Sequence, residues 1–305
     1  MVGLILSTLQ RTVMAGTSLL LGTTGEIITE RSGVLNLGVD GMMNLGAVAG
    51  FIVTIHTGNV LVGILASLVA GVAAAALHGF LSVYVKVNQT VSGLALTMLG
   101  VGLAGVLGKP YIGQQLPVKL DAFELPLLGD IPLIGELLFH QDMLFYAGVL
   151  LSLSSWFFLR YTRGGIRVRS VGENPKASES QGVPVQRIRF LCTLLGGAFA
   201  GLAGAHVSLS YSNSWTEGIV AGRGWIVVGL TIFSLWNPLR GMIGAFLFGG
   251  IFVTQYILQP LGIPPNLLAM LPYGATLMVL LLDGLRKDKR SLHAPGALGQ
   301  PYSRT

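Results

Sequence analysis

The chain has 305 residues, of which 52% are hydrophobic and only 10% are charged, and its mean hydropathy is +0.70. A soluble domain carries roughly a quarter of charged residues, so this composition excludes a soluble globular fold and indicates a protein of the lipid bilayer. The net charge of +6 does not indicate a nucleic-acid partner, because the basic residues cluster beside apolar segments, as orientation in a membrane requires.

Long apolar segments rich in Leu, Ala and Gly favour helices over the alternating strands, each of about ten residues, of a membrane barrel. We therefore predict an all-α fold, a polytopic integral membrane bundle of about eight to ten transmembrane helices in residues 1–284, followed by a polar tail at 285–305. In chain order the predicted spans are Thr12–Ile28, Val39–Ile55, Val60–Val85, Thr90–Leu107, Met143–Leu159, Phe190–Ser210, Gly224–Leu235, Met242–Ile257 and Leu267–Leu282. The seventh is too short to cross roughly 30 Å of hydrocarbon alone, so we expect it to belong to a broken or re-entrant element.

Charged residues are distributed unevenly among the segments that connect these spans. Residues 160–189 are rich in arginine and the tail adds further basic residues, whereas residues 109–142 carry mainly Asp and Glu. Because basic segments beside spans stay on the cytosolic side, we predict that 160–189 and the tail are cytosolic and that 109–142 is external. With nine spans the N-terminus is external as well.

Two spans contain glycines at four-residue spacing, Gly46 with Gly50 and Gly197 with Gly201. Small residues at this spacing let helix backbones approach closely, so we expect both ridges to be packing surfaces. Cys192 is the single cysteine, which excludes an intramolecular disulfide, and we expect it to be a small core residue.

Polar residues at membrane depth need a reason to be there. Asn36, Asp40 and Asn44 recur at four-residue spacing and share one face if the segment is helical. Two interpretations stay open for them: a polar lining of a solute path, or a packing network that fixes the bundle. Asn88 is explained as the cap of the fourth span, and the adjacent Gln89 is a further candidate for the path.

Aromatic and charged residues gather between the sixth and seventh spans. Trp215 and Tyr211 are expected to be interfacial anchors more often than ligand-stacking groups. Glu217 and Arg223 form either a structural pair or a reader of polar solutes, so Trp215 and Glu217 are kept as path candidates. His78 and His206 are expected to be packing histidines, and no spacing of His, Cys or acidic residues indicates a metal site.

The predicted cytosolic loop contains a short helix with start and stop signals. Asn174 is a good N-cap, Pro175 suits the first helical position, and Gly182 followed by Pro184 ends the helix. These residues predict a helix over Pro175–Gln181. An exposed polar helix adds little to a membrane core, so it is either a docking element for a cytosolic partner or an ordinary connector.

Several motifs resemble those of one transporter family. The segment Gly172-Glu-Asn-Pro175, with Ala177 and Gly182 after it, resembles the coupling loop of ABC importer permeases of the branched-chain amino acid, ribose and nucleoside superfamily. The segment from Glu30 to Met43 is similar to a signature of the nucleoside-type members, although relatives often carry Glu at the positions of Asp40 and Gln89. Later similarities are Thr216-Glu-Gly, Ala221-Gly-Arg-Gly224 and Trp236-Asn-Pro238. By this resemblance the ATPase-coupling residues are Gly172, Glu173, Asn174, Pro175, Lys176, Ala177 and Gly182.

The resemblance implies a type II-like permease subunit in the cytoplasmic (inner) membrane of a prokaryote. Its partners would be an ABC ATPase, a second permease that is a copy or a paralogue, and an extracytoplasmic substrate-binding protein. This chain would have no catalytic residue and would bind no cofactor or metal. In agreement, Gly108-Lys109 is followed by Pro110 and lacks the rest of a phosphate-binding loop, so ATP would be used by the partner. The implied solute is a nucleoside or a similar small polar molecule; the alternatives are a permease for simple sugars such as ribose, and an ion-coupled secondary transporter.

Overall fold

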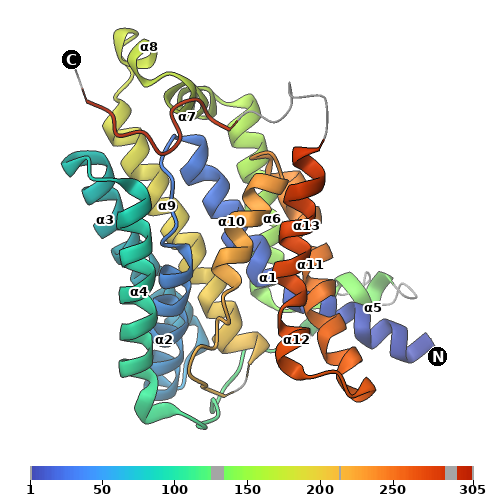
Figure 1. The fold of residues 1–305 in the computed structure, drawn as a ribbon. Coiled ribbons are helices and arrows are strands. Elements are labelled where there is room, and N and C mark those ends of the chain that lie inside the picture. Colours follow the sequence, from blue (N-terminus) through green and yellow to red (C-terminus); the bar gives the residue numbers. More distant parts are fainter. Residues whose placement is uncertain (1, 125–133, 213, 286–293, 304–305) are drawn as a thin grey trace.

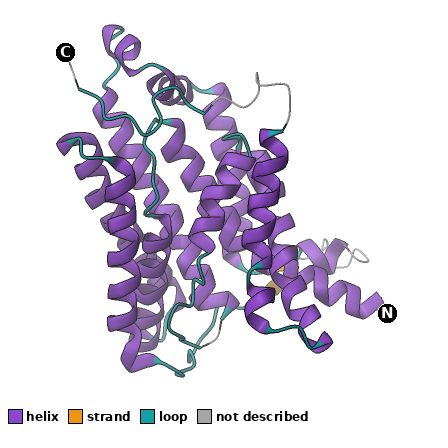
Figure 2. Cartoon of the chain, in the orientation of Figure 1, coloured by secondary structure: helices purple, strands orange, loops and turns teal. Residues whose placement is uncertain are grey.

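The computed structural model describes residues 2–124, 134–212, 214–285 and 294–303. These residues form a bundle of helices that run mostly along one common direction (Figure 1). Figure 2 shows how little other regular structure the described part of the chain holds: the two-residue strands β1 (Phe123–Glu124) and β2 (His140–Gln141), which pair antiparallel. The predicted all-α class is confirmed.

The α-helices follow the predicted spans closely. They are α1 (Val2–Arg31), α2 (Val39–Thr57), α3 (Val60–Gly79), α4 (Gln89–Gly108), α5 (Ile134–Leu138), α6 (Met143–Tyr161), α7 (Arg163–Glu173), α8 (Pro175–Ser180), α9 (Val185–His206), α10 (Arg223–Phe233), α11 (Pro238–Leu258), α12 (Pro265–Ala269) and α13 (Leu271–Gly284). Two π-helical turns extend α3 and α9, namely η1 (Phe80–Val85) and η3 (Val207–Tyr211), and two 3-10 turns, η2 (Lys109–Tyr111) and η4 (Gln259–Leu261), extend α4 and α11.

Six of the described helices, extended by these turns, are long and apolar enough to cross a membrane: Val39–Thr57, Val60–Val85, Gln89–Tyr111, Met143–Tyr161, Val185–Tyr211 and Pro238–Leu261. Helix α1 has 30 residues and is longer still, but polar side chains such as Glu26 and Glu30 interrupt its apolar character. The seventh predicted span is α10, whose 11 residues confirm that it is short. The ninth is broken at Met270 into α12 and α13. The chain is therefore a multi-pass membrane protein.

Helix α1 lies inside the bundle, where it packs against α9, α10, α11 and α6 (Figure 1). Helix α9 also packs against α2 and α3, and the predicted glycine ridges lie at these contacts. A Cβ on Gly46 of α2 would lie 2.6 Å from the carbonyl oxygen of Gly201 on α9. A Cβ on Gly197 would lie 2.2 Å from the Cβ of Ala75 on α3. Larger side chains do not fit between these backbones, so the packing role of the ridges is confirmed.

The bundle has two structurally different ends. At one end, called here the α8 end, lie α7, α8 and the C-terminal residues (Figure 1). The N-terminus, α5 and α12 lie toward the other end. There, residues 112–120 pair with the segment after α9, through backbone bonds between Gly113 and Trp215 and between Leu120 and Leu209. These bonds attach part of the predicted external loop to the bundle, and residues 125–133 of the loop lie outside the described part.

Candidate functional site

The short helix predicted in the arginine-rich loop is present at the α8 end. Helix α8 spans Pro175–Ser180 and is one residue shorter than predicted, because Gln181 lies in the turn that follows. The side chain of Asn174 accepts a hydrogen bond of 3.0 Å from the N–H of Ala177, and a proline takes the first helical position. Gly182 ends the turn with a φ of 76°, in the left-handed region that favours glycine. The predicted capping is confirmed.

A second helix in this loop, α7, is not predicted from the sequence. Its N-cap is Thr162, whose hydroxyl accepts from the N–H of Gly165 at 3.0 Å. Val168 and Val171 are buried at a three-residue spacing, which places both on the inner face of the helix. The cap and these two valines are the signal that was available, but the arginines between them obscure it. The loop is therefore a pair of helices rather than one helix with flexible flanks.

The C-terminal segment, residues 294–303, returns to this loop and packs on it (Figure 1). The N–H of Ala297 donates to the carbonyl of Gly172 at 2.8 Å, and the N–H of Gly296 donates to the carboxylate of Glu173 at 3.2 Å. The hydroxyl of Tyr302 donates to the carboxylate of Glu179. The segment thereby connects the end of α7 with α8. The prediction treats residues 285–305 only as a polar tail, because contacts across more than a hundred residues leave no local pattern.

Arg189 fastens the C-terminal segment to α9. Its side chain is buried, with 2% of its surface exposed, and its guanidinium donates to the carbonyls of Gln300 at 3.0 Å and Ala297 at 3.5 Å. The ring of Tyr302 packs with Val171 and Val185 in a small apolar cluster. The C-terminal segment therefore contacts α7, α8 and α9 and connects these three helices.

The residues assigned to ATPase coupling lie together on this structure, and their contact with an ATPase stays a prediction. Gly172 is buried and bonds to the C-terminal segment, and Pro175 is half-buried. The exposed members are Glu173, Asn174, Lys176, Ala177 and Gly182. The loop thus presents a polar surface beyond the end of the bundle.

The polar residues predicted at membrane depth are buried and bond to the protein itself. Asn36 precedes α2, so it does not share a helical face with Asp40 and Asn44, and that expectation is wrong for Asn36. The Asn36 amide instead donates to Glu26 at 2.9 Å, and its carbonyl oxygen accepts from the N–H of Gly38 at 3.1 Å. Asn36 thereby closes the turn that leads into α2.

Asp40 and Asn44 do lie on one face of α2. The Asn44 amide donates to the carbonyl of Asp40 at 2.8 Å and to its carboxylate at 3.3 Å. The other carboxylate oxygen of Asp40 accepts from the N–H of Gly224 at 2.9 Å, at the start of α10. This bond gives a partner to one of the first N–H groups of α10, which have no acceptor within the helix. Of the two interpretations that the sequence left open, these contacts favour the packing network.

Gln89 and His78 hold the backbone of Leu35, beside Asn36. The Gln89 carbonyl oxygen accepts from the N–H of Leu35 at 2.7 Å. His78 bonds to the carbonyl of Leu35 at 3.1 Å and to the hydroxyl of Ser92 at 3.0 Å, which agrees with its prediction as a packing histidine. Both side chains are buried, so the connection between α1 and α2 is fixed by α3 and α4.

The candidate residues between α9 and α10 differ in burial: two are buried and one is exposed. Trp215 is 2% exposed and its ring lies 5.4 Å from that of Phe51, so it is a core residue rather than an interfacial anchor. Arg223 is buried, donates to the carbonyls of residues 219 and 220, and lies over the ring of Tyr211 at 4.7 Å. Glu217 is exposed on the surface of the turn. Whether Trp215 or Glu217 meets a solute stays a prediction.

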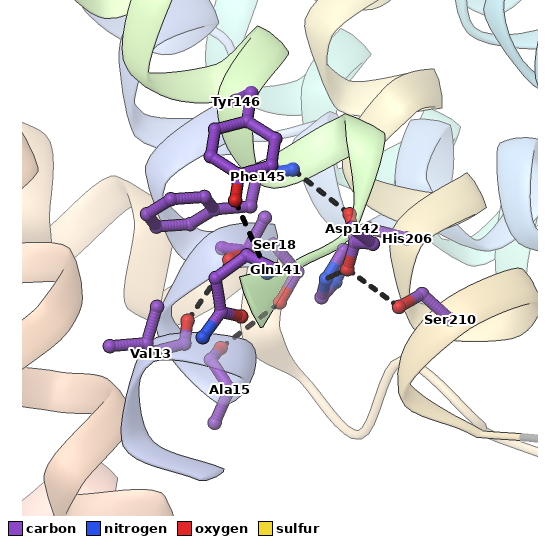
Figure 3. Close-up of polar contacts among 10 residues, drawn as sticks. Val13, Ala15, Ser18, Gln141, Asp142, Phe145, Tyr146, His206 and Ser210 are labelled. Carbon is purple, nitrogen blue, oxygen red and sulfur yellow. Dashed lines mark hydrogen bonds and ion pairs between the residues drawn. The ribbon is translucent and has the colours of Figure 1, made fainter. Parts of the chain in front are cut away.

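A buried polar cluster centres on Asp142 at the start of α6 (Figure 3). One carboxylate oxygen caps the helix by accepting from the N–H of Phe145 at 2.9 Å. The other accepts from the hydroxyl of Ser210 at 2.7 Å and lies 3.2 Å from Nε2 of His206. Burial alone would raise the pKa of the Asp142 carboxyl, but the contacts with His206, Ser210 and Phe145 outweigh it and lower this pKa to about 2.

Two cavities lie beside this cluster, toward the end opposite α8. Their volumes are about 540 and 450 Å³, and they share a wall formed by Ser7, Arg11 and Met14 of α1. Tyr211 and Tyr256 line the larger one, whereas Asp142, Ser210 and His140 are among the residues that line the smaller one. Both offer hydroxyl and guanidinium groups that can bind a polar solute, and the smaller one adds carboxyl groups. This region is absent from the sequence prediction, because residues 7–14, 140–142 and 253–257 come together only in the fold.

Sequence reasoning also missed two buried carboxyls of α1. Glu26 and Glu30 are each 1% exposed, one helical turn apart. Glu26 accepts from Asn36, and Glu30 accepts from the indole of Trp236. Acidic residues four apart in an apolar helix were the available signal. They join α1 to the start of α2 and to the α10–α11 turn.

Known proteins resemble this chain over nearly its whole length. It is 38% identical to the putative glucose ABC transporter permease protein TsgC13 of Haloferax volcanii, over 97% of each chain. It is 31% identical to the guanosine ABC transporter permease protein NupQ of Bacillus subtilis, over 95% of this chain and 94% of the relative. For the nucleoside ABC transporter permease protein NupC of Lactococcus lactis the identity is 30%, over 87% and 88%.

The model of one permease family matches residues 8–281, which include the six described helices that are long and apolar enough to cross a membrane and the α7–α8 loop. This range covers most of the chain, and the three relatives are likewise named as permease proteins. The protein belongs to the family of permease components of branched-chain amino acid transport systems and their relatives.

Proposed function

We propose that this chain is the translocation subunit of an ABC importer that carries a nucleoside inward across the cytoplasmic membrane of a prokaryote. Membership of the permease family supports a role in transport. Relatives named for guanosine and nucleoside transport support a nucleoside as the solute. A simple sugar is the second candidate, because a relative named for glucose transport is 38% identical over nearly the full length. Nucleosides and sugars share a polyhydroxylated ring, which hydroxyl and carboxylate groups can bind by hydrogen bonds.

The observation that carries the proposal is the construction of the α7–α8 loop. Its exposed helix is capped at Asn174, while the C-terminal segment and the buried Arg189 brace it against α9. A braced polar helix outside the membrane contributes little to the membrane core. If a partner moves it, the spans packed against it can move with it as rigid bodies. We assign it as the docking element for an ATPase subunit, which would bind and hydrolyse ATP.

This role sets the orientation of the bundle. The α8 end, with residues 160–189 and the C-terminal segment, faces the cytosol, and residues 109–142 face outward. The arginines of the loop support this orientation, since basic residues stay on the cytosolic side. A second permease, identical or paralogous, and an extracytoplasmic binding protein would complete the system. The cavities beside Asp142 then lie toward the side from which the solute arrives.

Charge reversal on the exposed face of α8 tests the docking role. Lys176→Glu changes an exposed side chain and keeps the Asn174 cap, so we expect assembly with the ATPase and ATP-dependent uptake to fall at least tenfold. Lys86→Glu is the matched control, because it makes the same charge change at an exposed position of the α3–α4 turn. Uptake and ATPase assembly that are equal in both variants would sink the docking role.

Uptake by reconstituted vesicles separates the remaining alternatives. We expect labelled guanosine to enter only with ATP, the ATPase and the binding protein present, and unlabelled glucose not to compete. If unlabelled glucose reduced the uptake and unlabelled guanosine did not, a simple sugar would become the first candidate solute and a nucleoside the second. Uptake driven by an ion gradient without any ATPase would instead establish a secondary transporter.

A further inference from the structure

A basic cavity lies at the α8 end, where α6 ends and α11 begins. Its volume is about 320 Å³, and three arginines line it: Arg31 of α1, Arg160 of α6 and Arg169 of α7. The indoles of Trp156 and Trp236 form part of its wall. None of the lining residues in the described chain is acidic. Three guanidiniums around a small space with no lining carboxylate make a site for an anion.

The N-terminus of α11 adds positive potential to the same cavity. Asn237 and Pro238 line it, and they are the N-cap and first residue of this 21-residue helix. The first N–H groups of a helix and its dipole favour a bound anion. The opposing carbonyls at the end of α10 are neutralised, because Arg31 donates to those of Leu235 and Trp236, each at 3.0 Å. The same two bonds hold the Arg31 guanidinium in place.

The neighbouring helix surfaces are apolar and exposed. Helices α6 and α11 pack together, and Leu153 and Phe157 of α6 are 42% and 57% exposed. On α11, Ile243 and Leu247 are each 60% exposed. Both helices are long and apolar enough to cross a membrane, so these exposed side chains lie at a depth where lipid chains can contact them. Trp156, half-buried at the cavity, is the residue type that favours the headgroup level.

We propose that this cavity binds the phosphate headgroup of an anionic phospholipid, whose acyl chains lie along the exposed faces of α6 and α11. The arginines and the start of α11 contact the phosphate, and the apolar faces distinguish a lipid from free inorganic phosphate. Arg160 and Arg169 come from the last turn of α6 and from α7, so the lipid connects a membrane span to the α7–α8 loop. The proposal does not depend on which solute the protein carries.

The test measures lipid binding to the purified transporter complex with its full-length chains. Delipidated complex is titrated with phosphatidylglycerol or phosphatidylcholine, and bound lipid is counted by native mass spectrometry. The cavity variant is Arg160→Gln with Arg169→Gln; Arg31 is left intact because it also fixes the end of α10. The control is Arg163→Gln with Arg167→Gln, which removes the same charge from exposed positions of α7 that do not line the cavity.

An arginine near a headgroup is worth about fivefold in affinity, so we expect the cavity variant to bind phosphatidylglycerol about 25-fold more weakly. The control should stay within about twofold, and phosphatidylcholine should bind more weakly to the wild type. Equal losses in both variants, or equal binding of the two lipids, would overturn the proposal. Complete displacement by an equal concentration of inorganic phosphate would assign the cavity to a free anion. Lipid binding that appears only after the ATPase is stripped away would show that the ATPase occupies the site.

Discussion

Helix α8 and the polar residues around Asp40 are both small polar features of an apolar protein, but they are stabilised in opposite ways. Helix α8 is exposed, and its cap joins Asn174 to Ala177, three residues away. Asp40 is buried, and its carboxylate bonds to Gly224, which is 184 residues away. The first arrangement uses local chemistry, and the second exists only when α2 and α10 are packed.

This difference has a physical consequence for mutation. An exposed helix that loses a cap can regain hydrogen bonds from water, so the cost is small and local. A buried polar group that loses its partner regains nothing, so the cost is large and extends to the whole bundle. We therefore expect substitutions at buried polar contacts to destabilise the protein more than loss of the exposed cap does.

The largest effect is expected at the buried cluster of Asp142. Asp142→Ala removes the α6 cap and leaves His206 and Ser210 buried without their acceptor. We expect the free energy of unfolding to fall by about 3–5 kcal/mol, because the lost cap costs about 1 kcal/mol and each buried group left without its partner costs about 1–3 kcal/mol. Thermal unfolding of the purified protein in detergent measures it. Asp142→Asn keeps an acceptor for the cap but removes the acidic group, so it should lose less than Asp142→Ala; a protein as stable as the wild type would show that the acidic group is unimportant.

A slightly smaller effect is expected where α10 meets Asp40. A Cβ on Gly224 would lie 2.3 Å from the Cα of Asp40 and 2.5 Å from its backbone nitrogen, so Gly224→Ala must push the helices apart. Overpacking of this kind costs up to about 3 kcal/mol. The control is Gly102→Ala on α4, where an added Cβ meets nothing within 4 Å. A Gly224→Ala protein as stable as this control would show that the α2–α10 contact is loose.

An intermediate effect is expected at Arg189, which belongs to the α8 end but is buried. Arg189→Gln leaves the carbonyls of Ala297 and Gln300 without their charged donor, at a cost of about 2 kcal/mol. Hydrogen exchange should accelerate in residues 294–303 and in α7 and α8, while the spans stay protected. Arg187→Gln changes an exposed arginine of the same helix and should leave exchange unaltered. Faster exchange throughout the bundle would contradict a local role.

The smallest effect is expected at the cap of α8. Asn174→Ala should cost about 1 kcal/mol and mainly reduce hydrogen-exchange protection within α8, because a helix of six residues has little else to hold it. Asn88→Ala removes a similar cap from the 20-residue α4, where packing should preserve the helix. Equal losses of protection in α8 and in the first turns of α4 would mean that packing, rather than the cap, stabilises α8. Asn174→Asp keeps the acceptor and should restore protection.

The sequence predicts much of the fold but less of the candidate site. Each predicted span falls on a helix, because a run of apolar residues bounded by polar ones is a local property that the bilayer enforces. The cap at Asn174 and the turn at Gly182 are local as well. Helix α7 is missed although Thr162 and two buried valines mark it, since the surrounding arginines hide a short amphipathic pattern.

The partners of the buried polar residues are decided only by tertiary structure. From the sequence, Asn36, Asp40 and Asn44 fit a solute path and a packing network equally well, and only their contacts with Glu26, Gly224 and each other favour packing. Asp142 and His206 are 64 residues apart and share no motif. The C-terminal segment likewise shows no sign in its own sequence that it will cover Gly172.

The amino-acid sequence is enough to show that this is a helical membrane protein, where its spans lie, and which short helix projects from them. These properties follow from hydrophobicity, charge and capping, which act between neighbours in the chain. Packing of the helices into a bundle buries the polar residues of α2, places residues 294–303 against the α7–α8 loop, and brings three arginines from α1, α6 and α7 to one cavity. Those arrangements depend on burial and on contacts between distant segments, which exist only once the helices have packed.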